Sequence, residues 1–218
     1  MIRHPFNNNL HLFYKSEYRG WPVQISKGPL ISEYLDLLYE TMNKALSQYS
    51  RVFAFRVDLR FPTFLDASPH FQSNAVVERF IESFKAKNRH NRSQAKKDFA
   101  RVHDSRVRYV WAREVGLLGR PHFHFVFFLN QQAYSALGYY EYGRHNIYNR
   151  LHASWASALG FPVDSVRGCV EFPDSPCYIL KRDDVDSMAN FFYRASYLCK
   201  SATKNYGTGC HCFGASRG

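Results

Sequence analysis

The stretch that decides the fold is residues 111–129, WAREVGLLGRPHFHFVFFL, in which two apolar and aromatic segments flank a short connection. Apolar patterning predicts one strand over Arg106–Val115 and a second over His122–Asn130. The loop between them, Gly116–Pro121, contains two glycines and a proline, which is typical of a tight turn between antiparallel strands. We therefore expect a β-hairpin.

The second strand of this hairpin has two chemically different faces. Side chains at alternate positions of a strand point the same way, so His122 and His124 emerge together. Phe123, Phe125 and Phe127 then point to the opposite face and are expected in the core. Two imidazoles on one face can chelate a divalent cation.

A carboxylate strengthens this interpretation, because a lone His-x-His pair is close to chance in a chain with 10 histidines. Glu114 closes the preceding strand, and across a tight hairpin the end of one strand lies beside the start of the next. Glu114, His122 and His124 would form an open site for Mg²⁺, Mn²⁺ or another borderline cation, with room for water and a phosphate oxygen. The alternative is a pair of hydrogen-bonded surface histidines.

Working outward, RVFAFRVDLRF over Arg51–Phe61 alternates apolar and charged residues and predicts a half-buried strand. Further strands are expected near Val166–Phe172 and Cys177–Leu180. Helices are predicted over about 30–49, 74–100 and 144–159, and from a cap at Asp183 or Asp184 to about Ser201. This order favours an α+β fold, an antiparallel sheet with helices packed on one face in a ferredoxin-like arrangement.

We expect three segments along the chain. Residues 1–50 would form an N-terminal extension and helix, residues 51–202 the main domain, and residues 203–218, rich in Gly and Ser, a flexible tail. The role of the first segment is open.

Charge points to a polyanionic partner. The chain has 29 Lys and Arg against 18 Asp and Glu, a net charge of +11, and 17% aromatic residues, so nucleic acid fits better than a membrane surface. Five cysteines form no even disulfide framework, and neither a signal peptide nor a membrane-spanning run is evident, which favours the cytoplasm.

A third feature lies in the last predicted helix, NFFYRASYLCK. Tyr193, Tyr197 and Lys200 are spaced by four and three residues, which at ~100° per residue places them within about 60° on one helical face. An aromatic stripe in the core is the alternative, but a lysine that continues the stripe needs an anion. A tyrosine phenol, with a pKa of about 10, needs a cation or base nearby to act as a nucleophile.

These motifs, in the order VDLRFP, WAREVGLLGRPHFHFVFFL and YRASYLCK, resemble the HUH superfamily of rolling-circle replication initiators and relaxases. The resemblance covers roughly Arg51 to Ser201 and is nearest to prophage and inovirus-type initiators. It implies that His122, His124 and Glu114 bind the metal. It also implies that Tyr197 is the primary nucleophile, assisted by Lys200, and that residues 51–202 are an HUH nuclease domain.

The resemblance further implies nicking and joining of single-stranded DNA at a replication origin through a 5′-phosphotyrosine intermediate. A host helicase and polymerase would be partners, since the chain has no helicase-like phosphate loop. Tyr193 resembles the second nucleophile of two-tyrosine initiators, or it is a packed neighbour. The other candidates are an HUH transposase or relaxase, and a non-catalytic single-stranded nucleic-acid-binding module.

Two features remain open or minor. Basic residues between positions 85 and 101 form either a solvated helix face or a phosphate-tracking surface; they are Lys85, Lys87, Arg89, Arg92, Lys96, Lys97 and Arg101. Cys210-His211-Cys212 with Cys199 matches no standard zinc spacing. Tyr109 and Trp111 are expected in the core.

Overall fold

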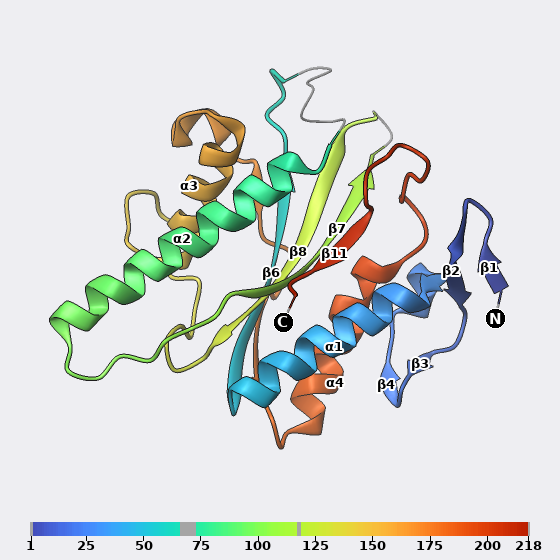
Figure 1. Cartoon of the computed structure of the whole chain (residues 1–218), viewed down its shortest axis with the longest axis horizontal. Coiled ribbons are helices and arrows are strands. Elements are labelled where there is room, and N and C mark those ends of the chain that lie inside the picture. The colour runs from blue at the N-terminus through green and yellow to red at the C-terminus, as the bar shows by residue number, and fades with distance from the viewer. Residues whose placement is uncertain (1, 66–72, 117–118, 218) are drawn as a thin grey trace.

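The computed structural model describes residues 2–65, 73–116 and 119–217, and its centre is a six-stranded sheet (Figure 1). The strand order is β10 (Cys177–Lys181), β6 (Arg51–Arg60), β8 (Pro121–Asn130), β7 (Arg108–Val115) and β11 (Phe213–Ala215). A short strand, β9 (Val170–Glu171), pairs with the other end of β6. Every pairing is antiparallel, so the predicted α+β class with an antiparallel sheet is confirmed.

The predicted hairpin is β7 and β8, and all of β7 pairs with residues 121–128 of β8. Residues 117 and 118 of its connecting loop lie outside the described residues. The α-helices of the described residues are α1 (Ser32–Gln48), α2 (Ala75–Asp98), α3 (Ile147–Leu159) and α4 (Val185–Ala195). None of the helices in the described ranges is long and apolar enough to cross a membrane.

One face of the sheet carries the predicted phenylalanine core. Phe123, Phe125 and Phe127 of β8 are fully buried there beneath α2 and α3. Phe80 of α2 contacts the Phe125 ring at 5.1 Å between centroids, and Trp155 of α3 at 5.9 Å. Burial of side chains of this size dominates the energetics of a core.

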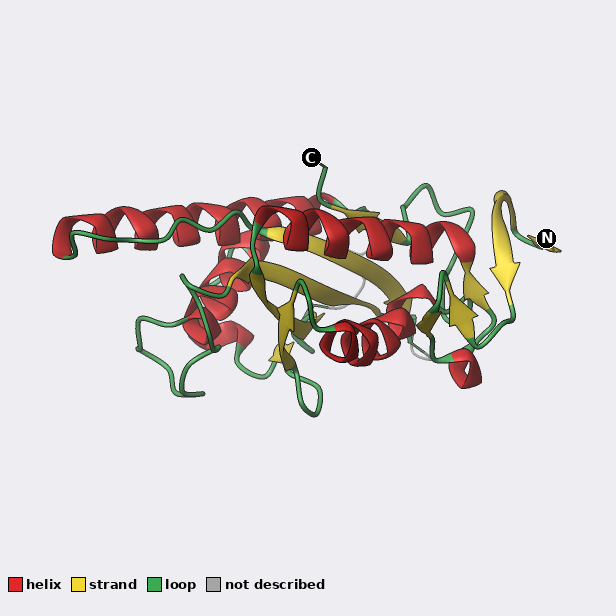
Figure 2. Cartoon of the chain, turned by 90° about the horizontal axis from the view of Figure 1, so that it is seen from below, coloured by secondary structure: helices red, strands yellow, loops and turns green. Residues whose placement is uncertain are grey.

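The opposite face is also covered, which corrects the expectation of helices on one face only. Val126 and Phe128 of β8 are buried in a second core with α1 and α4, where the rings of Phe128 and Phe191 lie 5.4 Å apart. Figure 1 shows α2 and α3 on one side of the strands and α1 and α4 on the other, and Figure 2 shows the sheet between helices from a second direction. The reason is that β8 is apolar at both parities, and a strand of that kind needs cover on both faces.

Strand β6 is likewise buried on both faces rather than half-buried. Val52 and Ala54 join the second core, and Arg56 is only 6% exposed. Of the charged residues that alternate in the sequence, Arg56 is buried and Asp58 is half-buried, while Arg60 is exposed and pairs with Glu171.

The N-terminal segment packs against the end of the chain. It forms a three-stranded sheet of β1 (Ile2–His4), β2 (Asn7–Phe13) and β5 (Leu30–Ile31), and a hairpin of β3 (Glu17–Tyr18) and β4 (Trp21–Pro22). The Ser201 backbone N–H donates to the Pro29 carbonyl at 2.8 Å, and His4 Nε2 lies 3.0 Å from the Ser201 hydroxyl. This segment therefore supports the region around Lys200.

The last helix ends earlier than predicted. The Asp184 side chain caps α4 by accepting from the Ser187 N–H at 3.0 Å, as expected, but the α-helix stops at Ala195. A 3₁₀ turn over Ser196–Cys199 follows, and Lys200 has extended backbone (φ −59°, ψ 142°). The single helical face predicted for Tyr193, Tyr197 and Lys200 is therefore wrong.

The expected flexible tail is also corrected, because much of it is built into the sheet. Strand β11 pairs with β7, and Phe213 stacks on Tyr34 of α1 with ring centroids 4.3 Å apart and planes 4° apart. Such a contact supplies the apolar burial that a loose segment lacks.

Candidate metal centre

Glu114, His122 and His124 meet on the face of the sheet that also carries α1 and α4. Glu114 pairs directly opposite His122 in the β7–β8 ladder, and His124 lies two residues further along. The Glu114 Oε2 atom is 3.9 Å from His122 Nε2 and 3.5 Å from His124 Nε2. One ligand atom from each residue lies within 4.8 Å of the others, so these three residues, hereafter the metal cluster, could hold a metal ion.

The donor set fits a cation. His124 Nδ1 lies 2.7 Å from the Asp58 carboxylate, and its buried Nε2 is directed to the cluster, 3.5 Å from Glu114 Oε2. A carboxylate behind a histidine fixes the imidazole tautomer that leaves the other nitrogen free for a metal. Burial, and then the charge of His124, lowers the pKa of His122 to about 4, so this imidazole is neutral at pH 7 and has a lone pair to donate.

Asp58 was not singled out from the sequence. It lies on β6 directly opposite His124, and its carboxylate would act behind the cluster rather than in it. Burial opposes a charge on His124, but the hydrogen bonds with Asp58 and Glu114 raise the pKa of its imidazole.

Glu114 is held on its other side by the end of the chain. Thr203 Oγ1 donates to Oε2 at 2.7 Å, Lys200 Nζ lies 3.0 Å from Oε2, and Lys204 Nζ lies 2.8 Å from Oε1. Burial would raise the pKa of Glu114, but the hydrogen bond from His124 and the charge of Lys204 hold it far below its usual value. The carboxylate is therefore ionised and positioned.

Two features of this arrangement are energetically unfavourable by themselves. The Lys204 side chain is fully buried, and burial lowers its pKa. Thr203 has a φ of 66°, a left-handed conformation that is uncommon for a β-branched residue. Strain of this kind persists where surrounding contacts over-determine it, and it clusters at functional sites.

Tyr197 stands next to the cluster. Its ring meets that of His124 edge-on, with centroids 5.9 Å apart, and Lys200 Nζ donates to its hydroxyl at 2.5 Å. Just after the 3₁₀ turn, the Lys200 backbone N–H donates to the Tyr197 carbonyl at 3.3 Å, which keeps the two residues together. The buried Arg56 guanidinium lies 5.7 Å from the centre of the same ring. Lys200 thus bridges the phenol and the Glu114 carboxylate.

Comparison with known proteins shows the family to which the chain belongs. A model of the YagK/YfjJ C-terminal domain matches residues 13–216. The chain belongs to this family. The Escherichia coli (strain K12) protein YfjJ is 32% identical over 201 residues, covering 88% of this chain and 97% of the relative. YagK of the same strain is 29% identical over 203 residues, covering 89% and 97%.

Both YagK/YfjJ relatives are described only as uncharacterized proteins, so membership gives the family but no activity. No solved structure matches the chain. The family match runs through both the N-terminal segment and the tail. The expected division at residues 50 and 202 therefore does not coincide with the extent of the family domain.

Tyr193 is not brought into the cluster of this YagK/YfjJ member. It lies on α4 and is 41% exposed, while its carbonyl accepts from Gln24 Nε2 at 3.0 Å. Among the described residues, no contact joins its side chain to Glu114, His122 or His124. The turn from α-helix to 3₁₀ at Ser196 is what separates it from Tyr197.

The minor candidates also have defined places. Within residues 2–65, 73–116 and 119–217, the metal cluster is the single group of three or more His, Cys, Asp or Glu side chains that could hold a metal ion, and it contains no cysteine. Cys199 is fully buried, and the Cys212 thiol donates to the Asn205 carbonyl. Trp111 is in the core, as predicted, and Tyr109 is half-buried against it.

Proposed function

We propose that this protein is a metal-dependent endonuclease and strand transferase that nicks and rejoins single-stranded DNA through a tyrosine. The observation that carries the proposal is the meeting of Tyr197, bonded by Lys200, with the Glu114–His122–His124 cluster. A nucleophile, a cation that activates it and a metal-ligand set within one site are the parts that phosphoryl transfer requires.

The chain's own residues would divide the work as follows. The Tyr197 oxygen attacks the phosphorus and forms the new P–O bond, while the P–O3′ bond breaks and the 3′ oxygen leaves. The proton that the phenol loses is balanced by the one that the 3′ oxygen takes up. Lys200 donates to the phenolic oxygen and stabilises its charge as the phenol loses its proton. Mg²⁺ or Mn²⁺ bound to Glu114, His122 and His124 would supply Lewis-acid stabilisation of the phosphate oxygens.

The product would be a free 3′-hydroxyl and a 5′-phosphotyrosine. The covalent bond retains the phosphodiester energy, so joining needs no ATP. This chemistry suits initiation and termination of rolling-circle replication, in which a host helicase and polymerase extend the 3′ end. Tyr193 is exposed on α4, before the 3₁₀ turn. If it is a second nucleophile, α4 or the DNA would have to move.

Incubation of the purified protein with a 5′- or 3′-labelled single-stranded oligonucleotide from its own replicon, in Mn²⁺ or Mg²⁺, tests the proposal. A covalent adduct should form on the 5′ phosphate of the downstream fragment, which keeps the 3′ label. It should disappear with EDTA and disappear in Tyr197→Phe. Tyr193→Phe is the matched control and should retain the first nick.

An adduct that survives Tyr197→Phe and is lost in Tyr193→Phe would reverse the roles of the two tyrosines. Binding of the oligonucleotide without an adduct in either metal would contradict the nuclease and leave a non-catalytic single-stranded DNA-binding module.

A further inference from the structure

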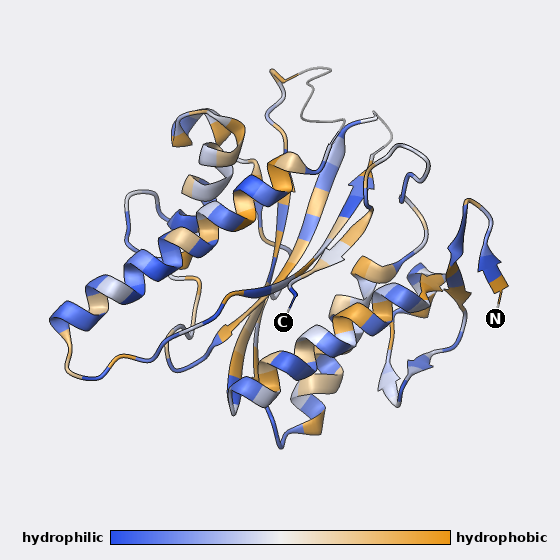
Figure 3. Ribbon diagram, in the orientation of Figure 1, coloured by the Kyte–Doolittle hydropathy of each residue, from blue (hydrophilic) through white to orange (hydrophobic). Residues whose placement is uncertain are grey.

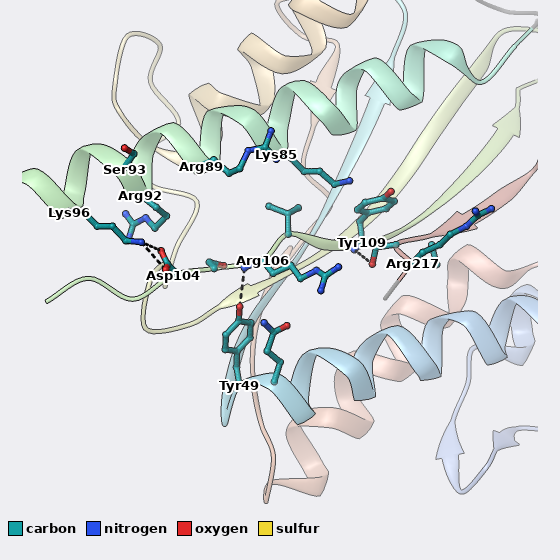
Figure 4. A pocket seen from close by; sticks show the side chains of 15 residues that line it. Tyr49, Lys85, Arg89, Arg92, Ser93, Lys96, Asp104, Arg106, Tyr109 and Arg217 are labelled. Carbon is teal, nitrogen blue, oxygen red and sulfur yellow. Dashed lines mark hydrogen bonds and ion pairs between the residues drawn. The ribbon is translucent and has the colours of Figure 1, made fainter.

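A groove of about 840 Å³ lies between α2, the end of α1 and the ends of β7 and β11 that are distant from the metal cluster (Figure 4). It is hereafter the basic groove. Tyr109 in the groove and Glu114 in the cluster are five residues apart on β7, which corresponds to about 17 Å along a strand. The two sites are separate.

One wall of the groove is a row of cations on α2. Lys85, Arg89, Arg92 and Lys96 line it with spacings of four, three and four residues, so they share one helical face over about 17 Å. Figure 4 shows Arg106 and Arg217 across from this row. Beyond Asn88, α2 has no buried residue and is hydrophilic toward its C-terminal end, as Figure 3 shows.

Most of this charge is not neutralised by the protein. Asp104 is the one acidic side chain among the described lining residues, and it pairs with Lys96 at 2.9 Å. Lys85 pairs with Glu82 of α2, outside the lining, at 2.8 Å. Arg89, Arg106 and Arg217 have no acidic partner in the described part of the chain. Guanidinium groups gathered without counter-charges repel one another, so the arrangement favours an anion.

A neighbouring arginine, Arg108, also lacks an anionic partner among the described residues. Arg108 donates to the Gln48 side chain at 3.0 Å, but its Nε and Nη1 are buried without partners. Burial, and then the charge of Arg106, lowers the pKa of Arg108.

The aromatic rings of the groove are already engaged. The Tyr49 hydroxyl accepts from the Arg106 backbone N–H at 3.0 Å, and the Tyr109 ring packs on the core with Lys85 Nζ 5.4 Å from its centre. Single-strand binders stack bases on open rings, whereas contact with a duplex backbone needs cations alone. The lining therefore suits phosphates rather than exposed bases.

We propose that the basic groove binds the phosphate backbone of double-stranded DNA. Duplex binding goes beyond the proposed function, because the groove is distinct from the metal cluster. The groove would hold a duplex next to the single strand. A row of about 17 Å spans roughly five phosphates of each strand of B-form DNA.

The test is binding of a labelled duplex of about 20 base pairs, measured by fluorescence anisotropy in EDTA over a series of salt concentrations. Arg89→Gln, Arg106→Gln and Arg217→Gln together should weaken binding and reduce the steepness of log K against log salt by about 2.7, because each phosphate that is no longer neutralised accounts for about 0.9. The matched control is the triple variant Lys87→Gln, Lys97→Gln and Arg101→Gln, which removes equal charge outside the groove. It should leave the affinity for the duplex and the slope of log K against log salt nearly unchanged.

A triple Arg→Lys variant at positions 89, 106 and 217 should keep the slope, because the charge is kept. Equal weakening in the groove and control variants, or a groove variant that loses single-strand but not duplex binding, would overturn the proposal. Adduct formation on a short single strand should persist in the groove variant. Duplex binding through the groove with no adduct in the wild type would instead contradict the proposed nuclease alone.

Discussion

At the scale of single residues, the candidate centre depends on side chains behind the metal cluster as much as on the cluster. Asp58 orients His124 at 2.7 Å, and Lys204, Thr203 and Lys200 hold Glu114. A buried carboxylate between two ammonium groups is positioned before any ligand arrives. That is the pre-organisation expected of a site that stabilises charge.

Asp58→Asn should weaken metal binding by about 10- to 100-fold, because the carboxylate that fixes the His124 tautomer is removed. Titration of Mn²⁺ by calorimetry measures the change. Glu171→Gln is the control, since Glu171 pairs with Arg60 at 2.8 Å and is not a partner of His124. Unchanged affinity in Asp58→Asn would contradict a supporting role.

His152 predicts a pH dependence of stability outside the metal cluster. It is 1% exposed, and burial lowers its pKa to about 4. Between that value and the ordinary pKa of about 6.5, the unfolded chain binds a proton that the folded chain does not, so the free energy of unfolding should fall as pH drops through this window. The loss is on the order of 3 kcal/mol at about 1.4 kcal/mol per pKa unit.

His152→Phe, which keeps a ring beside Tyr148 and Tyr142, should flatten this dependence in urea unfolding at pH 7 and pH 5. A substitution of the exposed His145 serves as the control and should leave the dependence unchanged. The same pH dependence in His152→Phe and wild type would exclude His152 as its source.

At the scale of elements, the sheet is predictable from its alternating residues, while its coverage and its last strand are not. The parity of His122–Phe127 correctly placed the phenylalanines in one core and the two histidines on the opposite face. That β8 is also covered by α1 and α4 was missed, because the helix on each face is chosen by long-range packing. The three-residue strand β11 is too short to give a periodic signal.

Gly214 explains how β11 fits. A Cβ on Gly214 would lie 2.7 Å from Trp111 Nε1, so Gly214→Ala must push a buried indole or detach the strand. We expect a loss of about 1–3 kcal/mol in the free energy of unfolding, measured in urea. Gly116→Ala, where the nearest atom lies 3.8 Å away, is the control and should cost less. Equal losses would mean that the Trp111 contact is unimportant.

At the scale of the whole molecule, the two ends of the chain close around the centre. The N-terminal segment contacts Lys200 and Ser201, and the tail supplies Thr203, Lys204 and β11. A chain that ends after residue 202 should lose at least about 3 kcal/mol, the typical cost of deleting a buried phenylalanine such as Phe213. Thermal unfolding measures this loss, and a chain ending at Ser216 is the control. A shortened chain as stable as the full one would contradict the structural role of the tail.

The sequence by itself determined the order of the central strands and the helices between residues 30 and 201, the hairpin, and the residues that could bind metal. These are local properties, because side-chain alternation and hairpin pairing depend on near neighbours. Only the tertiary structure brought Asp58 opposite His124, placed Lys204 on Glu114 and separated Tyr193 from Tyr197. The first two depend on contacts between residues 66 and 90 positions apart. The third depends on where packing ends α4, and periodicity encodes none of the three.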